Sequence, residues 1–243
     1  MKTIITYLFI IACSTLSFGQ KVNEVLQKMS EKITAPNVFC FDTKYSLYKD
    51  QKTNVAKQTY LGFFIKNQNN EIYYKIDNTE FINTKKMGLK INHKQKAMSI
   101  TNSQDFSTGS FDISKLMAFC TISSFIDNKT FWEIILTPKE LSGLNYSQIV
   151  LNIGTNYLLQ KQVFYYNTGF NLSNDYKKQL LDYPKLEIIY SGYNNKVNEV
   201  NKINTSLYFK INQNNKIQAT EKYKNYEVVD TRTNLINKNK AAN

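Results

Sequence analysis

The sequence predicts a mainly β protein with a few helices, and three observations predict this class. Tyr and Phe are abundant, at 17 and 15 of 243 residues, and aromatic side chains favour strands over helices. Apolar and polar residues alternate with a period of two in most segments after residue 38. Asn-rich turns separate these segments at short intervals, which is typical of antiparallel hairpins. We therefore expect one antiparallel sheet with helices against it.

The first twenty residues have the pattern of a secretory signal peptide. A positively charged start precedes an apolar run from Ile4 to Leu16, and small residues precede a cleavage site near Gln20. The segment Ile10 to Cys13 also fits a lipobox, in which the acylated cysteine would anchor the protein to a membrane. We expect residues 1–20 to be removed and the mature protein to be exported to the periplasm. Lipid anchoring through Cys13 and secretion are the alternatives.

A helix opens the mature domain, and two long aromatic strands follow it. The helix is expected from five apolar residues at helical spacing, and it stops before Pro36. Residues 39–47 and 55–66 alternate with a period of two and predict the first two strands. The apolar face of the helix comprises Val22, Val25, Leu26, Met29 and Ile33. Further strands are expected at residues 71–77, 80–84, 89–92, 97–101, 131–137, 147–153, 157–166, 185–193, 206–211, 217–220 and 226–230.

Two segments interrupt this series of hairpins. The residues from Asp112 to Thr121 predict an apolar helix that would cover the concave face of a curved sheet as a lid. Its apolar face comprises Ile113, Leu116, Met117 and Cys120. Residues 168–181 predict a long polar loop, and residues 231–243 a polar tail. Residues 21–230 are therefore expected to form a single domain.

A curved sheet covered by helices has an interior that an acyl chain could occupy. Eight residues are expected to line it: Phe39, Phe41, Tyr45, Leu61, Phe63, Ile65, Leu116 and Met117. Alternation places the first three on one face of the first strand and the next three on one face of the second. The hairpin register is expected to merge these two stripes. The alternative is that the same side chains form a packed core.

The order of these elements resembles the outer-membrane lipoprotein carrier family, whose members have a LolA/LolB-like fold. Two short segments carry the resemblance further: Leu136-Thr137-Pro138-Lys139 after a strand, and Tyr223 to Asp230 as a last strand. The resemblance implies a curved antiparallel half-barrel of about eleven strands, with an N-terminal helix and a mid-chain helical lid. It also implies that a lipoprotein acyl chain is the ligand, bound in the periplasm.

The charge pattern argues against nucleic acid as a partner. The formal net charge is +12, but the cations are scattered along the chain, and all except Arg232 are Lys. Arg is the residue that reads phosphates and bases in bidentate fashion, so specific nucleic-acid recognition is not expected. Contact with an anionic membrane surface is compatible with the same charge.

The residue types do not fit a common enzyme. His93 is the single histidine, which excludes a site with several histidine ligands, and motifs of the Gly-x-Ser-x-Gly kind are absent from the sequence. We expect His93 to be exposed in a turn. Glu133 beside Trp132 could be a buried acid of raised pKa, but strand alternation favours an outward-facing side chain.

The sequence therefore predicts a non-catalytic periplasmic carrier or binding protein, monomeric and without a cofactor or metal. Its ligand would be a lipoprotein acyl chain or another hydrophobic molecule. The alternative is an exported protein-interaction module without a lipid ligand, since strand-borne Tyr residues also suit protein contacts. Export leaves Cys40 and Cys120, which could form a bridge or stay as two buried thiols.

Overall fold

A computed structural model describes residues 19–103, 113–172, 181–195, 197–212 and 216–232. Residues 1–18 of the predicted signal peptide, Asp112 and most of the predicted tail lie outside these residues. The N-terminal helix spans residues 19–34, and α2 spans Ile113–Phe119. The strands are β1 Phe39–Tyr48, β2 Ala56–Lys66, β3 Ile72–Ile76, β4 Thr79–Asn83, β5 Met87–Asn92, β6 Ala97–Asn102, β7 Cys120–Asp127, β8 Phe131–Pro138, β9 Tyr146–Gly154, β10 Leu159–Tyr166, β11 Lys185–Asn194, β12 Phe209–Ile211, β13 Ile217–Ala219 and β14 Glu227–Asp230.

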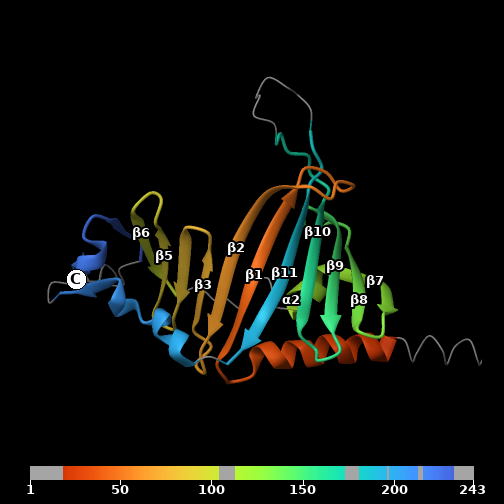
Figure 1. The fold of residues 1–243 in the computed structure, drawn as a ribbon, viewed down its shortest axis with the longest axis horizontal. Coiled ribbons are helices and arrows are strands. Elements are labelled where there is room, and N and C mark those ends of the chain that lie inside the picture. Colours follow the sequence, from red (N-terminus) through yellow and green to blue (C-terminus); the bar gives the residue numbers. More distant parts are fainter. Residues whose placement is uncertain (1–18, 104–112, 173–180, 196, 213–215, 233–243) are drawn as a thin grey trace, which may run out of the picture. The chain divides into compact units, whose positions relative to one another are not determined.

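The predicted mainly β class is confirmed. Twelve strands form one sheet in the order β14-β6-β5-β4-β3-β2-β1-β11-β10-β9-β8-β7, and β12 pairs with β13 separately (Figure 1). The order has two ends, so the sheet is open in the described part of the chain, and it has one strand more than the eleven expected. The chain divides into two compact units. Unit 1 holds the described residues of Met1–Ala35, Tyr45–Thr59 and Thr108–Tyr190, and unit 2 those of Pro36–Lys44, Tyr60–Ser107 and Ser191–Asn243.

Unit 1 contains both α-helices and strands β7 to β10. The predicted apolar face of the N-terminal helix is confirmed, because its five residues are at most 4% exposed. The helix passes the β9–β10 turn (Figure 1). The Lys28 ammonium lies 4.9 Å from the centre of the Tyr157 ring in this turn. The sheet of unit 1 buries one face completely, with Ile134, Leu136 and Leu151 all at 0% exposure. Burial of such side chains stabilises the unit by about 1.5–3 kcal/mol each.

The mid-chain helix is shorter than predicted. It ends at Phe119, and Cys120 begins strand β7, whereas the sequence predicted helix as far as Thr121. Strand β7 is an edge strand in which Ser123 and Ser124 interrupt the alternation of apolar and polar residues in the sequence. A β-bulge between Ile122 and Ser124 also shifts its pairing register with β8. Movement of α2 as a lid stays a prediction.

Unit 2 contains the β3–β4 and β5–β6 hairpins, and β14 covers the outer edge of β6. The β14 pairing is parallel, with Glu227 opposite Ala97 and Asp230 opposite Ile100, so the sheet is not wholly antiparallel as expected. The other pairings within the two units are antiparallel, as predicted.

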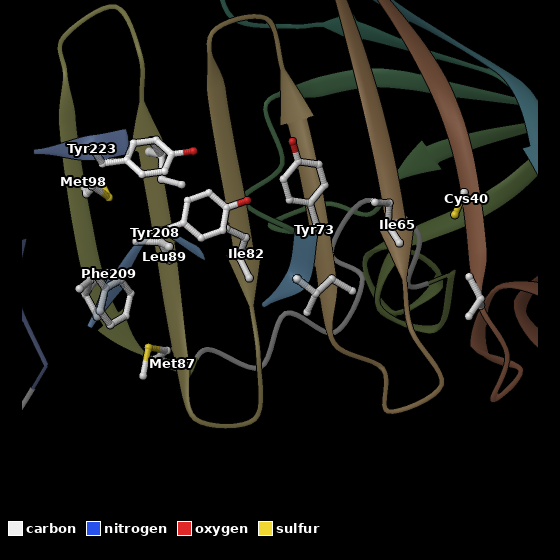
Figure 2. Packing of buried hydrophobic residues seen from close by; sticks show 14 residues of the cluster. Cys40, Ile65, Tyr73, Ile82, Met87, Leu89, Met98, Tyr208, Phe209 and Tyr223 are labelled. Atoms are coloured by element: carbon white, nitrogen blue, oxygen red, sulfur yellow. The ribbon is translucent and has the colours of Figure 1, made fainter. Parts of the chain in front are cut away.

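A segment that follows β11 covers one face of the unit 2 sheet. It contains three 3-10 helices, η1 Val197–Ile203, η2 Thr205–Leu207 and η3 Glu221–Tyr223. The strand predicted at 206–211 is present only in its second half, as β12, because η2 takes its start. Figure 2 shows Tyr208 and Tyr223 of this segment beside Ile82, Leu89 and Met98 of the sheet. These residues are at most 4% exposed. We call residues 197–226 the covering segment.

Both cysteines in the described ranges are free thiols. Cys40 and Cys120 are both buried, at 0% and 2% exposure, so the structure follows the alternative of two buried thiols. None of the helices in the described ranges is long and apolar enough to cross a membrane.

Candidate functional site

The predicted interior residues of the first strand and those of the second strand lie on opposite faces of the sheet. The Phe41 ring stacks on Phe64, with ring centres 4.7 Å apart, so Phe41 shares a face with Phe64. Phe63 and Ile65 are the chain neighbours of Phe64 in β2 and point to the other face. The predicted merging of these residues on one face is therefore wrong, because side chains of successive strand residues point to opposite faces.

Two of the predicted residues of β2 belong to the apolar core under the covering segment. Ile65 is fully buried in the cluster under the covering segment (Figure 2), and Phe63 packs against that cluster. The Lys202 ammonium lies 5.0 Å from the centre of the Phe63 ring, a cation–π contact from η1. Leu61 is 69% exposed, so it lines no buried interior, contrary to expectation.

The remaining predicted residues divide between the units. Phe39 and Phe41 belong to unit 2, and Tyr45, Leu116 and Met117 are half-buried residues of unit 1. A shared cavity for these five residues stays a prediction.

Phe39 and Phe41 are part of a larger aromatic surface in unit 2. We call it the aromatic stripe, and it comprises Phe39, Phe41, Phe64, Tyr74, Phe81 and Tyr193. Phe64 lies opposite Tyr74 across β2 and β3, and Tyr74 opposite Phe81 across β3 and β4. Tyr74 and Phe81 stack with ring centres 4.4 Å apart, and Lys90 lies 5.6 Å from the Phe81 ring centre. The contacts are within the range in which aromatic pairs attract each other.

The stripe changes from buried to half-exposed along its length. Phe41 is 1% exposed and Phe64 6%, whereas Tyr74 and Phe81 are half-buried. Burial raises the pKa of Tyr193, so this phenol stays neutral at physiological pH. The six rings of the stripe are therefore uncharged, and Lys90 lies at its outer end.

The sequence held a signal for the outer end of the stripe. Asp77-Asn78 is a two-residue turn, and such a turn fixes Ile76 opposite Thr79 and hence Tyr74 opposite Phe81. Phe64 and Tyr193 carried no such signal, since their contacts with Phe41 depend on pairings across long connections.

A polar network lies on the opposite face, under the covering segment. His93 was expected to be exposed, but its side chain is only 25% exposed, and both ring nitrogens have partners. Nε2 donates to Glu80 Oε1 at 2.7 Å, because a carboxylate can only accept, and Nδ1 lies 2.9 Å from the Tyr226 hydroxyl. Tyr208 donates to Glu80 Oε2 at 3.3 Å. Burial and the Glu80 carboxylate raise the pKa of Tyr73 and Tyr208, which keeps both phenols neutral.

This network is structural in character. Both Glu80 oxygens and both His93 nitrogens contact protein groups, and these contacts join the sheet to the covering segment. Glu133 faces away from the buried Trp132 and Ile134, as predicted. Among the described residues, no three His, Cys, Asp or Glu side chains are grouped so that they could hold a metal ion.

The fold and the stripe define a class: a mainly β protein built on one open sheet, with an aromatic surface on one face. No family model and no curated protein matches the sequence. Among solved structures, the chain is similar to an uncharacterized conserved protein from Thermus thermophilus, at a TM-score of 0.46 and 10% identity, over 86% of this chain and 99% of that one. It is also similar to a DUF1329 family protein from Desulfovibrio piger, with a TM-score of 0.39 and 10% identity, over 75% of this chain and 95% of that one. A LolA superfamily protein from Nitrosomonas europaea matches with a TM-score of 0.35 and 12% identity, over 73% of this chain and 96% of that one.

The last of these structures carries the name of the family that the sequence resembles. All three likenesses have TM-scores below 0.5, so the function proposed next rests on the residues of this chain.

Proposed function

We propose that the protein is an exported, non-catalytic binding protein or carrier for a hydrophobic ligand with an acyl chain. The aromatic stripe is the observation that supports this proposal. A lipoprotein or a free lipid would supply such a chain, and the export signal predicted in residues 1–20 favours the periplasm as the site of action.

The position of the stripe favours a ligand surface over a core. The apolar core of unit 2 lies on the other sheet face, where the covering segment buries it. The stripe thus adds a second apolar surface that ends in half-exposed rings at Tyr74 and Phe81. Neighbouring aromatic rings that stay partly exposed, as Tyr74 and Phe81 do, are typical of binding surfaces. An acyl chain is a suitable occupant because it gains burial against flat rings without needing hydrogen bonds.

Titration with a fluorescent fatty acid tests the proposal. We expect Phe64→Ala to weaken binding, since it removes the central ring of the stripe, and Tyr74→Ser to weaken it with little loss of stability. Phe209→Ala is the matched control, because Phe209 is equally buried, at 3%, but lies in the covered core on the other face. Both Phe→Ala changes cost about 3–5 kcal/mol of stability if the rings are tightly packed.

The outcomes separate the alternatives. Weaker binding by Phe64→Ala and unchanged binding by Phe209→Ala support the stripe as the ligand surface. A wild type that binds no fatty acid, but co-purifies with one polypeptide, would replace the carrier with a protein-interaction module. Equal loss of binding in both variants would mean that global stability, not the stripe, controls binding.

A further inference from the structure

A pocket of about 480 Å³ opens between the covering segment and two hairpin turns of unit 2. Its lining includes residues 84–86 of the β4–β5 turn and, on the covering segment, Asn201, Asn204 and Thr205. We call this space the turn pocket. Its volume falls in the range of small-molecule sites, roughly 300–1,000 Å³. The lining shares no residue with the aromatic stripe or with the Glu80 network, so the pocket is a separate feature of the unit.

Hydrogen bonds hold the sheet side of the turn pocket in place. Glu71 Oε1 accepts from the backbone N–H of Lys85 at 3.3 Å and Oε2 accepts from Asn67 Nδ2 at 2.9 Å, which joins the β2–β3 turn to the β4–β5 turn. The Thr84 hydroxyl oxygen accepts from the backbone N–H of Lys86 at 3.3 Å. The Lys85 and Lys86 side chains therefore start from a fixed turn. Two ammonium groups against the one Glu71 carboxylate give this side a net positive charge.

The polar groups that remain open in the turn pocket are hydrogen-bond donors. In the described part of the chain, neither the Lys85 nor the Lys86 ammonium has a hydrogen-bond acceptor or an ion-pair partner. Asn204 uses its Oδ1 to cap η2, which leaves its Nδ2 to donate. The Asn201 amide and the Thr205 hydroxyl have no partner among the same described residues. All five groups can donate, so the pocket suits a ligand that is rich in acceptors and negatively charged.

The composition of the lining argues against other ligand classes. Ten residues line the pocket, all within the described ranges, and eight of them are polar or charged. None of these ten described residues is aromatic, so a nucleotide base would find no ring on which to stack. Val200 and Ile203 are the apolar members, and Ile203 is only 4% exposed, which gives an acyl chain little surface to cover. The pocket therefore suits a small, polar and anionic molecule.

We propose that the turn pocket binds a phosphorylated sugar. The Lys85 and Lys86 ammonium groups pair with the phosphate, and Asn201, Asn204 and Thr205 form hydrogen bonds with the sugar hydroxyls. A phosphate monoester carries about −1.5 to −2 charges at pH 7 and three acceptor oxygens, which two ammonium groups can share. This site goes beyond the proposed function, since a sugar phosphate has no acyl chain and needs no contact with the aromatic stripe.

Calorimetric titration of the full chain with glucose 6-phosphate, glucose and inorganic phosphate tests the site. We expect glucose 6-phosphate to bind about tenfold more tightly than either of the other two, because only this probe contacts both sides of the pocket. Lys86→Met should weaken its binding about tenfold, the effect of one charge-assisted hydrogen bond. The urea midpoint should stay unchanged because Lys86 is exposed. Lys94→Met is the charge-matched control, since Lys94 is exposed in the β5–β6 turn of unit 2 and does not line the pocket.

Asn201→Ala tests the covering-segment side of the pocket. It should weaken binding of glucose 6-phosphate and leave binding of inorganic phosphate unchanged, because Asn201 is assigned to the sugar hydroxyls. Added glucose 6-phosphate should also slow hydrogen exchange in residues 200–205, which border the pocket, more than in β9 of unit 1.

Three results would overturn the proposal. The first is a wild type that does not bind glucose 6-phosphate, or binds it no more tightly than inorganic phosphate. The second is an equal loss of binding in Lys94→Met and Lys86→Met, which would show that net charge and not the pocket attracts the phosphate. The third is binding without slower exchange in residues 200–205, which would place the ligand elsewhere.

A sugar phosphate can be free or can be the headgroup of a lipid, and a competition titration distinguishes these sources. Dihexanoyl phosphatidylinositol 4-phosphate that displaces glucose 6-phosphate would support the site and extend it to lipid headgroups. Failure to displace it would support a site for free sugar phosphates alone. Fatty-acid binding that persists without binding of glucose 6-phosphate would refute the turn pocket and leave the proposed function intact.

Discussion

The Glu80 network should hold the covering segment on the sheet of unit 2, and Glu80→Gln tests this. The substitution keeps the size of the side chain but removes its charge. In the native protein Glu80 is 13% exposed and accepts from His93 Nε2 at 2.7 Å and from Tyr208 at 3.3 Å. The Tyr208 hydroxyl is shared with the Lys202 carbonyl oxygen, 3.1 Å away, so its bond to Glu80 is the weaker of the two.

The magnitude follows from these contacts. A hydrogen bond to a charged group contributes about 1.5–3 kcal/mol, and the shared Tyr208 bond about 0.5–1 kcal/mol. Glu80→Gln should therefore lower the free energy of unfolding by about 2–4 kcal/mol. The exposed Glu221→Gln removes an ion pair with Lys224 and should change the free energy by no more than about 0.5 kcal/mol.

Urea unfolding at neutral pH measures the global effect, and hydrogen exchange locates it. Exchange should accelerate in residues 205–212 and 216–226 of the covering segment more than in β9 of unit 1. A loss of stability no larger than that of Glu221→Gln would refute the reasoning. Uniform acceleration in both units would show that Glu80 does not act through the covering segment.

Three further predictions concern single residues. Lys66 is 1% exposed, and its ammonium donates to the Asn37 carbonyl oxygen at 3.2 Å and to Asn70 Oδ1 at 3.3 Å. Lys66→Met leaves both acceptors without this donor, so it should lower the free energy of unfolding at pH 7 by about 1–3 kcal/mol, measured by urea unfolding. Because burial raises the pKa of Tyr193 in the native state, the phenol ionises first in the unfolded chain, and this lowers the free energy of unfolding as the pH rises above 10. The free energy of unfolding of Tyr193→Phe should therefore fall less steeply than that of the wild type between pH 10 and 12. Gly192 has φ +63°, and an added Cβ would lie 2.5 Å from Asp42 Oδ2. Gly192→Ala should lower the free energy of unfolding by about 1–2 kcal/mol. This loss should be larger than that of Gly143→Ala, because Gly143 has φ +71° but open space around it. A Lys66→Met variant as stable as wild type, an unchanged alkaline transition, or equal losses of stability for the two glycine substitutions would contradict these three expectations.

Short-range features of the fold could be predicted because local chemistry decides them. The apolar spacing of the N-terminal helix and the two-residue turn at Asp77-Asn78 fix their elements without help from distant residues. The β1–β2 register could not be predicted in the same way. Its connection is the longer loop at residues 49–55, which does not fix which residues face each other.

Long-range contacts explain the other errors. His93 is half-buried because Tyr226, 133 positions away, covers it, and no local pattern shows that contact. Strand β7 was missed since an edge strand with a bulge needs little alternation to pair with β8.

The parallel pairing of β14 with β6 has a consequence for synthesis of the chain. Glu227 pairs with Ala97, and Asp230 with Ile100, so the outer edge of β6 stays unpaired until residues 130 positions later are made. At roughly 5–20 residues per second, that delay is on the order of 10 s. During this time the nascent sheet presents an unpaired row of peptide groups, which invites association with another growing chain. The yield of folded protein should therefore depend on translation speed and on holdase chaperones, and a chain that stops before residue 227 should aggregate even though most of its core is present.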